Sequence, residues 1–210
     1  MASVTVCGTA VASLTPDRAE LCLALSHLAA DAPTALAEIA RRSQQLEGVL
    51  AAHGLQRADW ATDGVQVGEE YQWRNDANVL VGYRAGTALT VTVRSIDLVG
   101  AVIGDGVTTA GASVRSLTWR IDADNPARRA LLGEAARDAR VRATAYAEAL
   151  GLRLGEVDEI SEAPLVDTPS PMPRMAMAMA AKMSDGVQVA VSGGLVELSA
   201  DVNVRFALLA

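Results

Sequence analysis

The chain has very few aromatic residues, and this shortage constrains its core. Only 3% of its 210 residues are Phe, Trp or Tyr, although half of all residues are hydrophobic. The core must therefore be built from Ala, Val and Leu, which gain less from burial than aromatic side chains do. A chain of this length still buries a sizeable core and fits one or two domains.

Lysine is almost absent, and no cluster of positive charge takes its place. Lys182 is the single lysine among 18 basic residues, and the net charge is −7. Phosphate backbones and anionic membranes are bound through clustered positive charge, so we expect no nucleic-acid partner. Every apolar run is well short of the roughly 20 residues that a membrane-spanning helix needs, so we also expect no membrane span.

The N-terminal residues resemble a strand rather than a targeting segment. Residues 1–18, MASVTVCGTAVASLTPDR, alternate in polarity and lack the basic stretch with which a signal peptide starts. We therefore expect no signal peptide and a cytoplasmic location.

The hydrophobic periodicity predicts antiparallel strands with helices between them, which is an α+β fold. Strands are expected at residues 3–12, 18–29, 60–72, 79–93, 112–122, 156–162 and 195–208. Helices are expected from Asp31 to just before Gly54, at 95–110 and at 126–150. The first two strands are expected to form a hairpin through Thr15-Pro16-Asp17, and the next two a second hairpin around 74–78.

The two long helices each carry an apolar stripe that predicts their buried face. In the first helix the stripe is Leu36, Ile39, Leu46, Val49 and Leu50. In the second helix it is Leu132, Ala135, Ala139, Ala143, Tyr146 and Leu150.

Several motifs together resemble the SIMPL domain family. They are VTVCGTAVASLTPDRAEL near the N-terminus, GYRAGTALTVTV at 82–93, the helix carrying Ala135, Arg137, Ala139 and Ala143, the turn at 151–155, and the closing SGGLVELSADVNVRF. The resemblance covers essentially the whole chain. It implies a single α+β domain over residues 1–210, with the Pro/Met/Ala-rich stretch 164–186 as an insert or arm before the last strand.

The same resemblance also implies a range of functions. Some family members form homo-oligomeric rings or cages, bacterial members are often periplasmic and associated with oxidative-stress tolerance, and a mammalian member is an adaptor for a signalling kinase. The family has no accepted catalytic motif, so the resemblance assigns no site residue to this chain.

No set of residues in the sequence predicts catalysis. The only histidines are His27, at a strand end, and His53, at a helix end, where the helix dipole and free carbonyls explain a histidine. The glycine-rich stretch 100–106 lacks the order of a phosphate-binding loop and fits a helix better. We therefore predict a protein that is not an enzyme, with no catalytic, cofactor-binding or metal-binding residue.

The two cysteines raise the question of a redox-responsive pair. In a hairpin that turns near Thr15, Cys7 and Cys22 face each other across the strands. Such neighbours form a disulfide only with strained geometry, and cytosolic thiols normally stay reduced. Free thiols are the favoured interpretation, and the sequence leaves a disulfide open.

The methionines of the 164–186 stretch have two interpretations. They are Met172, Met175, Met177, Met179 and Met183. Thioethers are ligands for Cu(I), but no His or Cys accompanies them here. An apolar arm that contacts another subunit is the favoured interpretation, because methionine adapts to irregular surfaces.

Two further groups of residues surround the third strand and its neighbours. The carboxylates Asp59, Asp63, Glu69 and Glu70 lack the spacing of a calcium loop, so a solvated edge or subunit rim is expected. The tryptophans Trp60, Trp73 and Trp119 are expected to anchor the core or an interface.

The favoured function is therefore self-association. We expect a non-enzymatic homo-oligomer whose hairpins and methionine-rich arm contact neighbouring copies, with the link to stress response that the resemblance implies. An adaptor for another protein, and a binder of a metal or small molecule at a subunit junction, are the alternatives.

Overall fold

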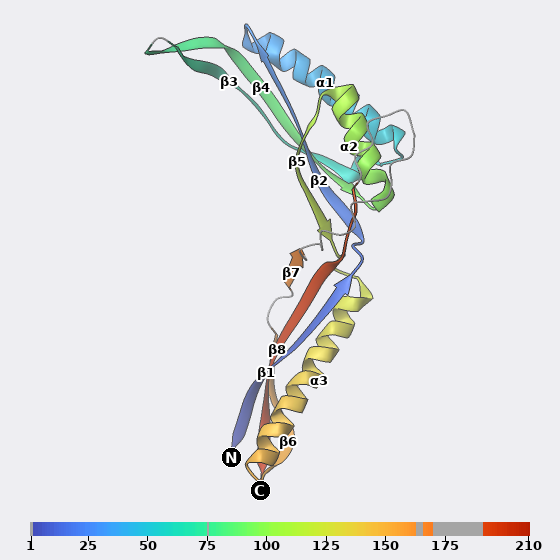
Figure 1. Cartoon of the computed structure of the whole chain (residues 1–210), viewed down its shortest axis with the longest axis vertical. Coiled ribbons are helices and arrows are strands. Elements are labelled where there is room, and N and C mark those ends of the chain that lie inside the picture. The colour runs from blue at the N-terminus through green and yellow to red at the C-terminus, as the bar shows by residue number, and fades with distance from the viewer. Residues whose placement is uncertain (1, 75, 163–165, 170–190) are drawn as a thin grey trace. The chain divides into compact units, whose positions relative to one another are not determined.

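The computed structural model describes residues 2–74, 76–162, 166–169 and 191–210. It confirms the α+β fold and divides the chain into two compact units, each with its own sheet (Figure 1). The first unit comprises Met1–Asp17, Arg120–Pro173 and Gly194–Ala210, and the second comprises Arg18–Trp119 and Arg174–Gly193. Most of the predicted insert 164–186 lies outside the described residues, and its residues 166–169 form a strand.

The sheet of the first unit is built around its C-terminal strand. β8 (Val196–Leu209) pairs antiparallel with β1 (Ser3–Leu14), β6 (Arg153–Glu162) and the short β7 (Val166–Pro169). Helix α3 (Pro126–Ala149) runs along one face of this sheet (Figure 1). The buried residues of β8 alternate along the strand predicted at 195–208: Val196, Leu198, Ala200, Val202, Val204 and Phe206.

Polar side chains fix the start of α3. The side chain of Asn125 accepts a hydrogen bond from the backbone N–H of Ala127 at 2.9 Å, and Pro126 occupies the first helical position. The carboxylate of Asp17 in turn accepts hydrogen bonds from the backbone N–H of Asp122 at 2.7 Å and from the amide of Asn125 at 2.8 Å. Asp17 therefore orients the residue that caps the helix.

Replacing Asp17 by alanine is expected to lower the free energy of unfolding by about 1–3 kcal/mol, because a backbone donor and a side-chain amide lose their acceptor. Urea unfolding at a fixed protein concentration measures the change. Asp17→Asn keeps one acceptor oxygen and should lose less. Equal losses in the two variants would contradict this explanation.

The buried stripe of α3 differs in part from the predicted one. Residues spaced four apart are buried, namely Leu131, Ala135, Ala139, Ala143 and Ala147. Leu132 is half-buried and packs against this core, but the inclusion of Tyr146 and Leu150 was wrong, because both are exposed. A row of alanines replaces larger side chains because the helix lies very close to the sheet.

At Gly8 of β1 the backbone of α3 lies very close to this sheet. A Cβ atom built on Gly8 would lie 2.0 Å from the backbone oxygen of Ala135 and 2.5 Å from the backbone nitrogen of Ala139. Both neighbours are backbone atoms of a helix, which cannot rotate away as a side chain can. The contact between β1 and α3 therefore requires glycine at this position.

The second unit places two helices on one face of a four-stranded sheet. The strand order is β3 (Trp60–Arg74), β4 (Ala77–Val93), β2 (Arg18–Ala29) and β5 (Ser113–Arg120). The helices are α1 (Ala32–Ala52) and α2 (Ile96–Ala110), with a short 3₁₀ turn η1 (Arg57–Asp59) before β3. Their side chains form one core with Leu21, Leu23 and Leu25 of β2.

The predicted hairpin between the first two strands was wrong. β1 pairs with β8, whereas β2 pairs with β4 in the sheet of the other unit. The turn residue Asp17 caps the start of α3 through Asn125 instead of closing a hairpin. Alternation shows which face of a strand is buried, but it does not identify the partner strand.

The buried stripe of α1 also needs one correction. Ile39, Leu46, Val49 and Leu50 are buried as predicted, but Leu36 is 42% exposed and Ala35 takes its place. The helix begins at the predicted cap, where the carboxylate of Asp31 accepts a hydrogen bond from the backbone N–H of Thr34 at 2.8 Å.

Candidate interaction surface

The hairpin of β3 and β4 is the most exposed part of the second unit. Its two strands are those that the sequence predicted, each longer by a few residues. Its far end extends away from α1 and α2 (Figure 1), and β3 forms the edge of the sheet. A two-stranded hairpin without cover is only marginally stable in water, and a long edge strand presents unpaired backbone groups.

The strand register assigns the inner half of the hairpin to the same side of the sheet as the helices. Val65 lies opposite Thr87 and Val67 lies opposite Ala85, and both partners on β4 are buried. Directly opposed residues share one face of a sheet. Val65 and Val67 therefore continue the face that α1 and α2 cover elsewhere.

The outer half of the hairpin keeps the same apolar face. After an irregularity in the register between Glu70 and Tyr71, Tyr71 lies opposite Leu80. Alternation along β3 then places Trp73 on the side of Tyr71. We define the hairpin face by six residues: Val65, Val67, Tyr71, Trp73, Leu80 and Tyr83.

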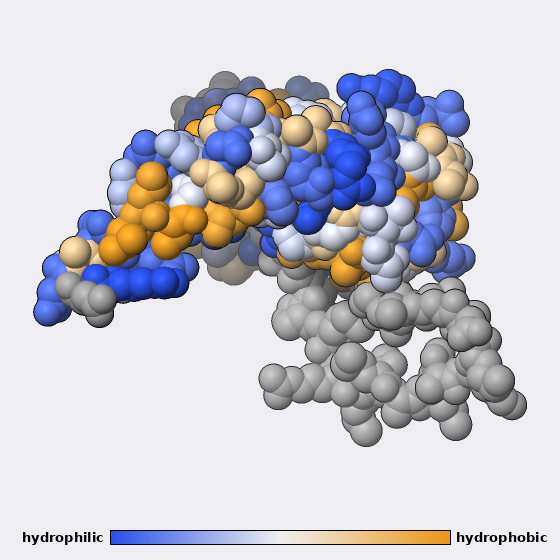
Figure 2. Space-filling view, turned by 90° about the horizontal axis from the view of Figure 1, so that it is seen from above, coloured by the Kyte–Doolittle hydropathy of each residue, from blue (hydrophilic) through white to orange (hydrophobic). Residues whose placement is uncertain are grey.

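The hairpin face is apolar and open to solvent. Five of its six residues are between 44% and 67% exposed, and Trp73 is the most exposed of them. Figure 2 shows a band of hydrophobic residues along the arm that the hairpin makes, beside a hydrophilic strip. Aromatic side chains with this exposure are typical anchors of protein interfaces.

The opposite face of the hairpin is mainly polar. The guanidinium of Arg84 donates to the carboxylate of Glu70 at 2.9 Å, and Arg74 donates to the side-chain oxygen of Gln72 at 2.6 Å. The hydrogen bond from Arg84 lowers the pKa of Glu70, so this carboxylate stays ionised at neutral pH. The two faces therefore differ in chemistry, as expected when only one of them is to be covered.

One carboxylate lies on the hairpin face itself. Glu69 accepts a hydrogen bond from the hydroxyl of Tyr71 at 2.6 Å, which raises the pKa of that phenol. Among the described residues it forms no ion pair. The hairpin face therefore combines apolar side chains with a carboxylate that has no ion-pair partner in the described part of the chain.

The structure gives each of the four predicted rim carboxylates a local role. Asp59 accepts from the backbone N–H of Gln56 at 2.7 Å, and Asp63 accepts from the hydroxyl of Thr90 at 2.9 Å. Glu69 and Glu70 bond to their hairpin neighbours as described above. In the described part of the chain, no group of three or more His, Cys, Asp or Glu side chains could hold a metal ion.

The three tryptophans lie at different depths. Trp60 is buried in the core of the second unit, and Trp119 is half-buried against that core. Trp73 is the exposed one and lies on the hairpin face. The sequence predicted that each anchors a core or an interface, but it contained no signal that separated Trp73 from the other two.

The secondary structure around the two histidines explains their positions. His53 ends α1, and its Nε2 lies 2.8 Å from a carboxylate oxygen of Asp105 on α2. The sequence reasoning missed Asp105, because no spacing signal connects the two helices. His27 is half-buried near the end of β2, and the glycine-rich stretch 100–106 is part of α2, as predicted.

The expected placement of Cys7 and Cys22 opposite each other was wrong, whereas the favoured interpretation of free thiols is confirmed. Both thiols are free: Cys7 lies opposite Asn203 in one sheet and Cys22 lies opposite Thr90 in the other. The hypothesis of a redox-responsive pair required a hairpin of the first two strands, and this hairpin does not form. The five candidate methionines lie outside the described residues.

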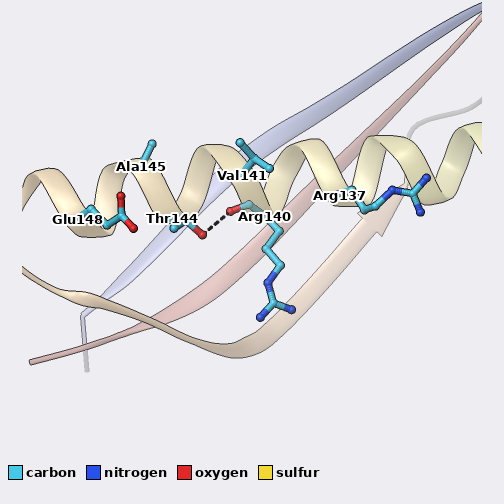
Figure 3. Close-up of a pocket in the computed structure, with 6 residues that line it drawn as sticks. All are labelled: Arg137, Arg140, Val141, Thr144, Ala145 and Glu148. Atoms are coloured by element: carbon cyan, nitrogen blue, oxygen red, sulfur yellow. Dashed lines mark hydrogen bonds between the residues drawn. The ribbon is translucent and has the colours of Figure 1, made fainter.

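A shallow hollow lies on the outer surface of α3. Its volume is about 520 Å³, and the described residues that line it all belong to this one helix: Arg137, Arg140, Val141, Thr144, Ala145 and Glu148. Val141 and Ala145 point to one side of the helix, whereas Arg140 points to the other (Figure 3). Sites for small molecules enclose most of the ligand with converging polar groups, and the described part of this lining, the surface of one helix, does not do this.

Membrane insertion through a helix finds no support in the described residues. None of the helices there combines the length and the apolar character that a bilayer crossing requires.

Comparison with known proteins gives a match along almost the whole chain. The family model of SIMPL, described as a protein of unknown function (DUF541), matches residues 4–206. The chain is similar to the 26 kDa periplasmic immunogenic protein of Brucella melitensis, with 27% identity over 214 residues, 98% of this chain and 84% of the relative. It is also similar to the uncharacterized protein YggE of Escherichia coli K12, with 28% identity over 206 residues, 96% of this chain and 81% of the relative.

Proposed function

Because the chain belongs to the SIMPL family, whose function is unknown, we propose its role from its own surface: it is a non-enzymatic protein that self-associates through the β3–β4 hairpin. The single observation that carries this proposal is the hairpin face, an apolar surface that continues a covered sheet face beyond its helices. Exposed apolar surface of this kind marks sites of protein contact.

A second copy of the chain is the partner that the hairpin fits best. The open edge of β3 offers backbone hydrogen-bond groups, and β-strand pairing between identical chains is a common route to homo-oligomers. Because one face of the hairpin is apolar and the other is mainly polar, a second copy would contact the apolar face. Rings or cages, as the resemblance implies for some relatives, would follow if the hairpin of one copy contacts a different surface of the next.

Sedimentation velocity of the full chain at micromolar concentrations tests the proposal. We expect a mass above that of the 21.8 kDa monomer, with a concentration-dependent distribution. Salt should change this distribution only weakly, because buried apolar area and not charge supplies most of the affinity. A monomer at every concentration would overturn the proposal.

Location and physiological process stay predictions. A cytoplasmic location was predicted from the N-terminal pattern, whereas one relative is named a periplasmic protein. Fractionation of cells that express the chain distinguishes the two locations. Survival of cells lacking the gene under peroxide tests the predicted link to stress response.

A further inference from the structure

The hairpin face requires a partner surface with three properties. It must be apolar, because Val65, Val67 and Trp73 would otherwise stay in water. It must present side chains at every second residue if it extends the sheet beside β3. It must also bring positive charge, because Glu69 on this face forms no ion pair in the described part of the chain.

The acidic character extends along the whole edge strand. β3 contains three carboxylates, Asp63, Glu69 and Glu70, and one basic residue, Arg74. The full chain is acidic too, with a net charge of −7. Electrostatic complementarity therefore favours a basic segment as the partner of this strand.

One segment outside the two sheets combines all three properties in its sequence. Residues 170–184 read SPMPRMAMAMAAKMS, with two basic residues, Arg174 and Lys182, and no acidic one. Met175, Met177 and Met179 recur at every second residue. This spacing places side chains on one face of an extended strand.

Methionine also suits the aromatic residues of the hairpin face. A thioether makes favourable contacts with aromatic rings and adapts to irregular apolar surfaces. Tyr71 and Trp73 offer two exposed rings on the same face. The alternating alanines between the methionines leave room on the opposite side of such a strand.

We propose that the hairpin face binds the methionine-rich segment 172–183 of a second copy of the chain, beside the edge of β3. This inference rests on the proposed self-association and names the surface that the second copy contributes. Each copy then carries one hairpin and one segment, which is a head-to-tail contact.

Complementation between two full-length variants tests the inference. The hairpin variant carries Val67→Glu and Trp73→Glu, and it keeps the segment intact. The segment variant carries Met175→Ser, Met177→Ser and Met179→Ser, and it keeps the hairpin intact. Each variant alone should associate at least about tenfold more weakly than the natural chain, whereas an equimolar mixture should form a 1:1 complex.

Matched control variants test whether the position of the substitutions, and not the change in composition alone, weakens association. Ala176→Ser, Ala178→Ser and Ala180→Ser introduce the same number of serines at the alternate positions and should leave association within about threefold of the natural chain. Gln66→Glu with Gln72→Glu adds the same charge to the opposite hairpin face and should have an equally small effect.

The outcomes distinguish this inference from the proposed function. If the natural chain and the segment variant associate equally, the inference is overturned and self-association stands. If the segment variant is monomeric and the mixture forms no complex, the proposed head-to-tail contact between the hairpin face and the segment is excluded. If the natural chain is monomeric, the proposed function and the inference fail together.

Discussion

Gly8→Ala is expected to lower the free energy of unfolding by about 3 kcal/mol or more, since a single methyl group must fit where no space exists. The new Cβ would lie 2.0 Å from the backbone oxygen of Ala135 and 2.7 Å from the Cβ of Ala139. To relieve this clash, α3 must move away from the sheet, and its alanine stripe then loses packing contacts. Urea unfolding at a fixed protein concentration measures the loss.

The control for this prediction is a glycine of α3 itself. A Cβ on Gly133 would meet only the guanidinium nitrogen of Arg137 at 3.7 Å, which is an ordinary contact with a flexible side chain. Gly133→Ala should therefore stabilise the protein by about 0.5–1 kcal/mol through helix propensity. A Gly8→Ala variant as stable as the natural chain would show that α3 does not pack this closely on β1.

The sequence predicted the elements of this fold better than their partners. The cap Asp31, the apolar stripe of 126–150 and the alternation of 195–208 identified helices and strands close to their observed bounds. Pairing depended on contacts distant in sequence, such as Gly8 with Val202, for which alternation gives no signal. The shortest connection, through Thr15-Pro16-Asp17, therefore suggested a hairpin that does not form.

The sequence predicted only part of the candidate site. The hairpin around residues 74–78 was predicted from its polar loop between two alternating runs. The exposure of the hairpin was not predicted, because Val65 and Val67 alternate with their neighbours in the same way as buried residues do. Only the extent of α1 and α2 over the sheet decides which valines are covered, and that depends on tertiary structure. Tertiary structure likewise distinguishes Trp73 from the other two tryptophans as a candidate interface residue.

The hairpin variant Val67→Glu with Trp73→Glu is expected to weaken self-association by about a hundredfold, because each substitution replaces an apolar anchor by a charge that would be buried on contact. Neither side chain belongs to the core: Val67 is 48% exposed and Trp73 is 67% exposed. The variant should therefore fold normally. Sedimentation velocity at matched concentrations measures the effect, and far-ultraviolet circular dichroism checks the fold.

The opposite-face variant Gln66→Glu with Gln72→Glu makes the comparison decisive. It adds two negative charges to the same strand, so a general electrostatic effect would weaken association equally in both variants. We expect it to keep the mass distribution of the natural chain, because alternation directs these side chains away from the hairpin face. Two variants that weaken association equally would argue that net charge, and not the apolar face, controls assembly. A hairpin-face variant with unchanged mass would remove this surface as the site of contact, even if the chain is oligomeric.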